Sequence, residues 1–336
     1  MTRILGGRAA QTVLTSAAYA SSTWDKIICA LNCLEDFELE SGLVLSWPVT
    51  PDIVSNFLHW CVFDRKLKPS SIVSYMSHIK LIHNLRGLDG SACDDFACKV
   101  QIRGAKNLQF YEPNRTNIKK VMSLPLLRIF GHNLASTDWS NHSKSVVWAA
   151  ACTAFFGSFR FGELLSKEEN SFNTFETLMW SDIKFFDDRS IQVHNKIPKN
   201  RTKDGEFISI FPFLQDTCCP VQAIVCLFNS AKAKNLGDKP VFTFENGSHL
   251  TLSKMNNFIV SFLEPQLGDQ ANFYSCKSFR AALPSALASH PHQENDVFIK
   301  RWGRWNSEAF ERYTRLSHSA KREIFARFAA ALFNSV

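Results

Sequence analysis

Four short stretches of the sequence place cationic side chains where they could bind an anion. They are FFGSFRFGELL with Arg160 and Glu163, the segment KNRTKDG at 199–205, YSCKSFR with Lys277 and Arg280, and RWGRWNSEAFERYTR with Arg304 and Tyr313. Lys277 and Arg280 lie one helical turn apart on one face, so they should repel each other unless an anion lies between them. Tyr313 stands between Arg312 and Arg315, which suits packing or a cation–π contact as well as a nucleophile. Taken singly, each stretch also fits a solvated surface.

Charge is unevenly distributed over the 336 residues, whose formal net charge is +7. Acidic residues dominate 25–64, whereas basic residues dominate 99–128 and 277–327. The basic residues of the middle block are Lys99, Arg103, Lys106, Arg115, Lys119, Lys120 and Arg128. Such blocks are either solvated faces or contacts to a polyanion, and composition alone leaves both open.

The elements that must position these residues are mostly helical. Apolar residues recur at helical spacing over 24–40 and 70–85, and Thr50 followed by Pro51 is typical of a helix start. The stretch 144–156 is almost wholly apolar and predicts a helix buried on all sides. Further helices are expected over 220–228, 252–263, 277–289, 294–302, 307–315 and 318–333.

The alternating segments 191–194 and 206–213 predict a β-hairpin with a long basic tip between them. The fold class expected is therefore mainly α with a small β-hairpin or sheet. Pro113 and the residues after it should break any helix and mark a domain boundary. We expect a disordered arm over 1–22, a helical domain over 23–112, a linker over 113–122 and a second, α+β domain over 123–336. The basic, acid-free start of the arm also resembles a transit peptide, and we favour the arm.

The ten cysteines form no CxxC pair and show no zinc-ligand spacing, so we expect reduced, mostly buried thiols in an intracellular protein and no metal. The uncharged stretch 146–157 is about 12 residues long, whereas a membrane span needs roughly 20. No pattern for a phosphate-binding loop or a metal-binding carboxylate cluster occurs, and we expect no cofactor.

Taken together in order, Arg160, a lysine, Lys277-x-x-Arg280, Gly303-Arg304 and Tyr313 resemble the catalytic set of the tyrosine recombinases (the phage-integrase family). That family has Arg, Lys, His-x-x-Arg, His or Trp, and Tyr in this order, with an acid three residues after the first Arg, matched by Glu163. The phrases FFGSFRFGELL, CKSFR and GRWNSEAFERYTR look most like the branch carried by crypton and DIRS-like mobile elements. The resemblance covers about residues 120–336.

The resemblance implies a site-specific DNA recombinase or transposase of a mobile element, which cleaves and rejoins DNA through a 3′-phosphotyrosine. Tyr313 would attack the phosphate, and arginines would clamp its nonbridging oxygens because they stay protonated and bind bidentately. A hairpin lysine would protonate the leaving 5′-oxygen. Among the three candidates, Lys203 fits best by counting back from the second strand, Lys199 comes next, and Lys196 is the third.

The family also implies a C-shaped clamp, in which a helical core-binding domain and the catalytic domain close around double-stranded DNA. Contacts to DNA are then expected from Lys99, Arg103, Lys106, Arg115, Lys119, Lys120 and Arg201. The family further implies a homodimer on DNA and a tetramer in synapsis, with the C-terminal helix docking into the next protomer; packing within its own chain is equally open. We expect a nuclear protein if the host is eukaryotic, and otherwise one of the cytoplasm or nucleoid, and no membrane partner.

Two positions depart from the family pattern. Lys277 stands where the family has His, and Arg304 stands where it has His or Trp, with Trp305 available to supply the packing of that Trp. Both replacements are cationic donors, which suits a working site as well as a descendant that binds DNA and has lost cleavage. A type IB topoisomerase-like enzyme shares this chemistry, and a helical scaffold binding acidic proteins is the alternative from another class.

Overall fold

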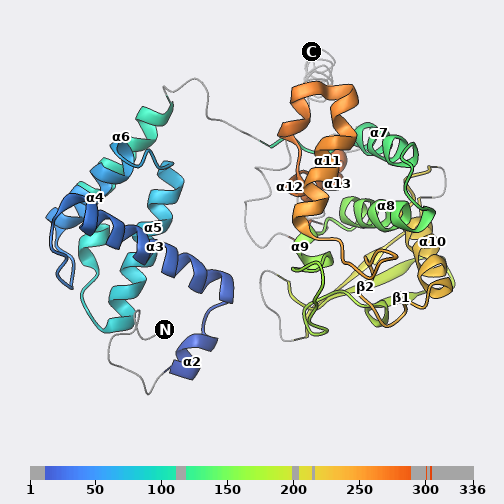
Figure 1. Ribbon diagram of the computed structural model, residues 1–336, viewed down its shortest axis with the longest axis horizontal. Coiled ribbons are helices and arrows are strands. Elements are labelled where there is room, and N and C mark those ends of the chain that lie inside the picture. Colours follow the sequence, from blue (N-terminus) through green and yellow to red (C-terminus); the bar gives the residue numbers. More distant parts are fainter. Residues whose placement is uncertain are drawn as a thin grey trace, which may run out of the picture. The chain divides into compact units, whose positions relative to one another are not determined.

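The computed structural model describes residues 12–110, 119–198, 204–213, 216–288, 300 and 303–304. The chain divides into two compact units, Met1–Thr116 and Asn117–Val336 (Figure 1). The predicted linker, 113–122, spans this division. The functions expected of the two units stay predictions.

Unit 1 is helical throughout its described part. Its elements are α2 (Thr12–Ala17), α3 (Ser21–Ser41), α4 (Pro51–Phe63), α5 (Pro69–Arg86), the short 3₁₀ helix η2 (Ser91–Asp94) and α6 (Phe96–Phe110). The Thr50 hydroxyl accepts a hydrogen bond from the Ile53 N–H at 3.4 Å, so the predicted cap at the start of α4 is confirmed. Phe37 of α3 packs edge-on against Phe57 and tilted against Trp60, and the rings of Phe57 and Trp60 stack, in the core between α3 and α4.

Within the expected arm over 1–22, the structure has α2 over 12–17, and α3 begins at Ser21. Tertiary contacts hold this segment: the Trp24 indole donates to the Ser16 carbonyl at 2.9 Å, and Tyr19 packs edge-on against Trp24. A segment without acidic residues can therefore form a helix here, because the Trp24 side chain holds it in place.

Unit 2 is built around one buried helix. Its helices are α7 (Leu124–Ala135), α8 (Asn141–Phe156), α9 (Phe161–Leu164), α10 (Pro220–Ala233), α11 (Leu252–Leu267), α12 (Cys276–Arg280) and α13 (Ala282–Ala288), with 3₁₀ turns η3 (Trp180–Asp182) and η4 (Gly268–Phe273). As predicted, α8 is enclosed along most of its length; α7, α10 and α12 pack on it (Figure 1). The predicted helix over 277–289 is interrupted at Ala281, which separates α12 from α13.

A three-stranded antiparallel sheet lies beside these helices, in the order β1 (Ile183–Phe185), β2 (Ile191–Asn195) and β3 (Glu206–Ile210). The predicted hairpin is confirmed: β2 and β3 pair with Asn195 opposite Glu206 and Ile191 opposite Ile210. Strand β1 is not predicted from the sequence, because three residues are too few for an alternating pattern. The mainly helical fold with a small sheet is as expected.

All ten cysteines are unpaired, and all except Cys29 and Cys226 are buried, as predicted. Within the described residues, no helix has the length and hydropathy that crossing a membrane requires. The predicted helices over 294–302, 307–315 and 318–333 lie outside the described residues, apart from isolated positions.

A buried histidine supports unit 1 and gives it a pH dependence. His83 is fully buried; its Nε2 accepts from the Val49 N–H at 3.0 Å, which leaves Nδ1 to donate to the Ile79 carbonyl at 2.8 Å. Burial lowers the pKa of His83, and Arg86 adds to this while the bond to Ile79 opposes it. The neutral ring is thus the form that the fold requires.

We therefore predict that the free energy of unfolding of unit 1 falls as the pH drops below about 6.5, the pKa of an unfolded histidine. The unfolded chain takes up the proton first, so the contribution of His83 is complete above that pH and is lost as the pH falls through the lower pKa of the folded state. Urea midpoints at pH 7.5, 6.5 and 5.5 measure this. His83→Gln should weaken the dependence, whereas exposed His59→Gln should not; equal pH dependence in both variants would contradict the assignment.

Candidate active site

A sharp turn after α8 begins the candidate site. Gly157 ends the helix, and an added Cβ there would lie 2.4 Å from the Phe159 ring and 2.9 Å from the Thr153 carbonyl oxygen. Ser158 follows with φ 48°, in the left-handed region. This turn makes the Ser158 carbonyl available to side chains from other elements. Phe159 and Phe161 are buried on either side of Arg160 and fix its backbone.

Glu163 is the buried anion of the site, with its side chain 6% exposed. Its carboxylate accepts from the Arg160 backbone N–H at 3.0 Å, from Arg160 Nη1 at 2.8 Å and from Arg304 Nη2 at 3.0 Å. Burial would raise the pKa of Glu163, but Arg304, the Arg160 N–H and Arg280 together outweigh it and lower the pKa. The carboxylate therefore stays ionised and offsets positive charge from several arginines.

Arg280 reaches the site from α12, a helix of five residues held by its neighbours. The Cys276 N–H donates to Asn256 Oδ1 of α11 at 2.9 Å, and Phe279 is buried edge-on against Phe161. The buried Arg280 guanidinium donates to the Ser158 carbonyl and to the Arg304 carbonyl at 3.3 Å. Burial, followed by the charges of Arg304 and Arg160, lowers the pKa of Arg280 to about 9.

Arg304 completes the cluster. Its Nη2 donates to the Ser158 carbonyl as well as to Glu163, both at 3.0 Å, and its Nη1 donates to Glu206 Oε2 at 2.8 Å. The guanidinium also lies 4.8 Å from the centre of the Phe159 ring. Glu206, the first residue of β3, is not among the site residues predicted from the sequence, because an acid at a strand end carries no local signal.

The arrangement can bind an anion. Three guanidinium groups meet only two carboxylates, Glu163 and Glu206, so the cluster formed by these five described residues keeps one net positive charge. Arg160, with its side chain 38% exposed, is the arginine most open to solvent. A phosphate group with one negative charge would balance the cluster, and the fixed donors would not need to reorganise around it.

Lys277 does not face the same surroundings as Arg280. Lys277 is exposed and makes no hydrogen bond or ion pair within the described part of the chain, whereas Arg280 is buried. The two cations of this helical turn thus differ in exposure, and the expected repulsion between them stays a prediction. The exposure differs because Phe279 and Cys276 pack inward and set the rotation of this short helix. A role for Lys277 in the site stays a prediction.

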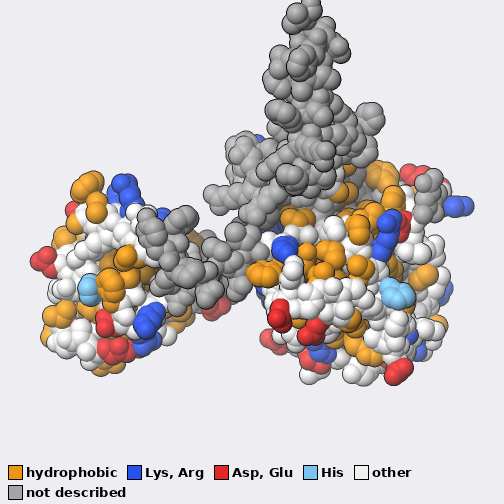
Figure 2. Space-filling view, turned by 90° about the horizontal axis from the view of Figure 1, so that it is seen from above, with side chains coloured by type: hydrophobic (Ala, Val, Ile, Leu, Met, Phe, Trp, Pro, Cys, Tyr) orange, Lys and Arg blue, Asp and Glu red, His pale blue; other side chains and the backbone are white. Residues whose placement is uncertain are grey.

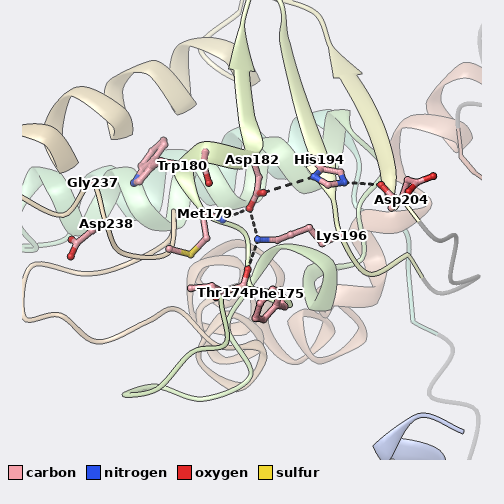
Figure 3. Close-up of a pocket in the computed structure, with 12 residues that line it drawn as sticks. Thr174, Phe175, Met179, Trp180, Asp182, His194, Lys196, Asp204, Gly237 and Asp238 are labelled. Carbon is pink, nitrogen blue, oxygen red and sulfur yellow. Dashed lines mark hydrogen bonds and ion pairs between the residues drawn. The ribbon is translucent and has the colours of Figure 1, made fainter. Parts of the chain in front are cut away.

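Of the three hairpin lysines, only Lys196 lies within the described residues. Lys196 is held by an ion pair with Asp182 at 2.6 Å and donates to the Thr174 carbonyl at 2.7 Å, in a pocket of about 770 Å³ beside His194 (Figure 3). Lys203 and Lys199, the first and second candidates for a general acid, stay predictions. Both lie outside the described residues, as do Tyr313, Trp305, Arg201 and Arg115.

The described basic residues of the middle block fall into two groups. Lys99, Arg103 and Lys106 are exposed on α6 at spacings of four and three residues, so they form one stripe. Lys119 donates to the Asn272 carbonyl at 2.7 Å and Lys120 to Gln270 Oε1 at 2.9 Å, so both dock on η4. On the face drawn in Figure 2, Lys and Arg side chains are scattered among acidic ones and do not form one patch.

We predict that Glu163→Ala lowers the free energy of unfolding by about 3 kcal/mol, because removing one partner of a buried ion pair leaves its cations without compensation. A shift of the urea midpoint at pH 7 measures this. Glu176→Ala is the control, since Glu176 forms a more exposed ion pair with Lys167 away from the cluster. A shift no larger than that of the control would show that Glu163 does not hold the arginines together.

Comparison with known proteins identifies the fold. No protein-family model matches the chain, and no curated protein matches it in sequence. The integrase of the Tn1549 transposon, in complex with transposon right-end DNA, is 13% identical, with 95% of this chain and 98% of that one aligned and a TM-score of 0.62. The XerH site-specific recombinase bound to palindromic difH substrate is 9% identical over 92% and 79% of the chains, with a TM-score of 0.56.

A lambda integrase tetramer bound to a Holliday junction is also similar, at 12% identity over 91% of this chain and 75% of that one, with a TM-score of 0.51. At these identities the likeness is one of fold. The helices and the small antiparallel sheet of this chain thus have the fold seen in these integrases and in this site-specific recombinase.

Proposed function

We propose that this protein is a tyrosine recombinase, which cleaves and rejoins double-stranded DNA. The observation that carries the proposal is the cluster of Arg160, Arg280 and Arg304 around the Ser158 carbonyl and Glu163, within a fold shared with DNA recombinases and integrases. The residues that meet there come from three segments far apart in the sequence. A structural ion-pair network would not need an excess of arginine over carboxylate.

In the reaction we propose, the Tyr313 hydroxyl gives its proton to a water molecule, and its oxygen attacks the scissile phosphorus. A bond forms between phosphorus and the tyrosine oxygen, and the bond from phosphorus to the 5′-oxygen breaks. The arginines stabilise the negative charge that builds up on the nonbridging oxygens, and Lys203 or Lys199 gives its proton to the leaving 5′-oxygen. Attack by a 5′-hydroxyl on the resulting 3′-phosphotyrosine reverses these steps and rejoins the DNA. No cofactor enters this scheme.

The finer assignment to a mobile element of the crypton or DIRS-like kind rests on the sequence phrases around Arg160, Arg280 and Tyr313. The similarity to a transposon integrase supports a mobile element in general. We further propose that the protein acts as a dimer on DNA and as a tetramer in synapsis, to which 318–333 contributes. The tetrameric lambda integrase is the supporting case.

A DNA-binding descendant without cleavage is the second candidate. Two observations favour it: Lys277 is exposed, and the terminal nitrogens of Arg304 already bind carboxylates and a carbonyl. A search for a covalent adduct separates the two candidates, and relaxation of supercoiled plasmid by a monomer would instead indicate a topoisomerase.

We predict that the protein forms a covalent adduct with a nicked duplex and that Tyr313→Phe abolishes it while DNA binding is retained. A library of nicked duplexes with randomised sequence, resolved on a denaturing gel, is the assay. Tyr274→Phe is the control: Tyr274 is close to the site in sequence, but it is buried and burial raises its pKa, which makes it a poor nucleophile. An adduct that persists in Tyr313→Phe and disappears in Tyr274→Phe would show that Tyr274, and not Tyr313, is the nucleophile.

We also predict that DNA affinity falls steeply with salt and that the stripe on α6 accounts for part of this. Replacing Lys99, Arg103 and Lys106 by Gln should flatten the slope of log affinity against log salt by up to about 3, or about one for each phosphate that is no longer bound. The matched control replaces three exposed lysines of the same unit, Lys26, Lys66 and Lys68. Equal slopes in the two triple variants would place the α6 stripe on a solvated face.

A further inference from the structure

Arg304 differs from the other two arginines in what its side chain binds. Both terminal nitrogens donate to groups of the protein itself, Glu206 on one side and Glu163 with the Ser158 carbonyl on the other. The side chain is only 10% exposed, and its buried Nε has no hydrogen-bond partner within the described residues. Arg304 therefore serves first to connect parts of the protein, and little of its surface is left for a ligand.

Glu206 connects this arginine to the hairpin. It is the first residue of β3, pairs with buried Asn195 of β2, and follows Gly205, whose φ is 70°. A Cβ on Gly205 would lie 2.6 Å from the Asn195 carbonyl oxygen, so the two strands approach closely here. The backbone of Glu206 is thus fixed by the base of the hairpin, while its side chain is fixed by Arg304.

The backbone of Arg304 is also committed. Its φ of 57° lies in the left-handed region, which is disfavoured for a residue with a Cβ. Its carbonyl accepts from Arg280 at 3.3 Å while its guanidinium bonds Glu206 at 2.8 Å. A single residue therefore joins the first residue of β3 to the buried arginine of α12.

Glu163 and Glu206 differ in the number of arginines with which they form ion pairs. Glu163 is shared between Arg160 and Arg304, whereas the only ion pair of Glu206 in the described structure is with Arg304. Glu206 is also the more exposed of the two, at 36% against 6% for Glu163. Its removal would leave the buried anion of the cluster in place and would release only the connection to the hairpin.

We propose that Glu206 is a positioning residue, which acts through Arg304 to hold the start of β3 against the arginine cluster. This inference rests on the proposed function, because the residues directly before Glu206 are those from which a general acid is expected. Arg304 stands where the family has His or Trp, and its ion-pair partner on the hairpin is the acid Glu206. The Arg304–Glu206 ion pair thus connects the hairpin to the arginine cluster through two side chains of this chain.

The opposite consequence of the same contact would be competition. A carboxylate on Arg304 Nη1 occupies a donor that a phosphate oxygen could use, and its removal would then speed cleavage. Positioning and competition therefore predict rate changes of opposite sign for the same variant.

The first test measures the connection itself, without any need for activity. Hydrogen exchange of the backbone amides in 204–210 should become about three- to tenfold faster in Glu206→Ala, because a charge-assisted hydrogen bond at this end of the strand is removed. Glu206→Gln, which keeps the shape and removes the charge, should show a smaller change in the same direction. Glu245→Ala is the matched control: its ion pair with Lys234 measures 2.7 Å and its side chain is 37% exposed, close to the values for Glu206.

The second test measures the consequence. In single-turnover cleavage of a nicked duplex, Glu206→Ala should lower the rate about 10- to 100-fold, the scale of a misplaced reacting group, while the Kd for DNA changes less than about twofold. In an Arg304→Met background, Glu206→Ala should lower the rate no further, because its partner is already gone.

Each failure has a distinct signature. If the parent protein forms no adduct, the proposed function fails, and the exchange measurement still decides whether Glu206 holds the hairpin. If the parent cleaves DNA but exchange in 204–210 is unchanged in Glu206→Ala, the inference is overturned and the function stands. A rate that rises in Glu206→Ala overturns positioning in favour of competition.

Discussion

One buried carboxylate, that of Glu163, determines whether the rest of the site can exist. Three guanidinium groups within one cluster repel one another, and burial makes that repulsion stronger because water no longer screens it. Glu163 accepts from two of them and lowers the potential at the third, so its own pKa is lowered although it is buried. With Glu206 as the second carboxylate, the three arginines still leave the cluster with one positive charge in excess. This imbalance suits the site to an anion.

The turn at Ser158 supplies the other fixed point. Because Gly157 and Ser158 reverse the chain immediately after α8, a backbone carbonyl faces the cluster and accepts from both Arg280 and Arg304. The most buried helix of unit 2 therefore sets the position of the arginines directly. The packing of α8 on all sides resists movement of that carbonyl, and the charged groups rest on the apolar core.

The segment that begins unit 2 also docks close to the cluster. The Lys120 N–H donates to the Phe273 carbonyl at 2.8 Å and the Met122 N–H to the Ser278 carbonyl at 2.9 Å, which places 120–122 along the residues that lead into α12. Two of the lysines expected to contact DNA thus have protein partners, whereas those of α6 remain exposed on one helix face. If the protein binds DNA as proposed, these two groups of cations contribute differently.

The sequence by itself determined the mainly helical class, the hairpin and the three arginines that the structure brings into one cluster. Those features depend on local periodicity, capping and turn residues, as at Thr50 and over 191–210, and on the order of a few motifs. It did not determine α2, which the Trp24 indole contacts through the Ser16 carbonyl, or β1, which is too short to show alternation. Only the tertiary structure decided that Lys277 faces solvent while Arg280 is buried, because neighbouring elements set the rotation of α12. It alone brought Glu206 to Arg304, since 98 residues separate the two and no local pattern can encode a contact at that range.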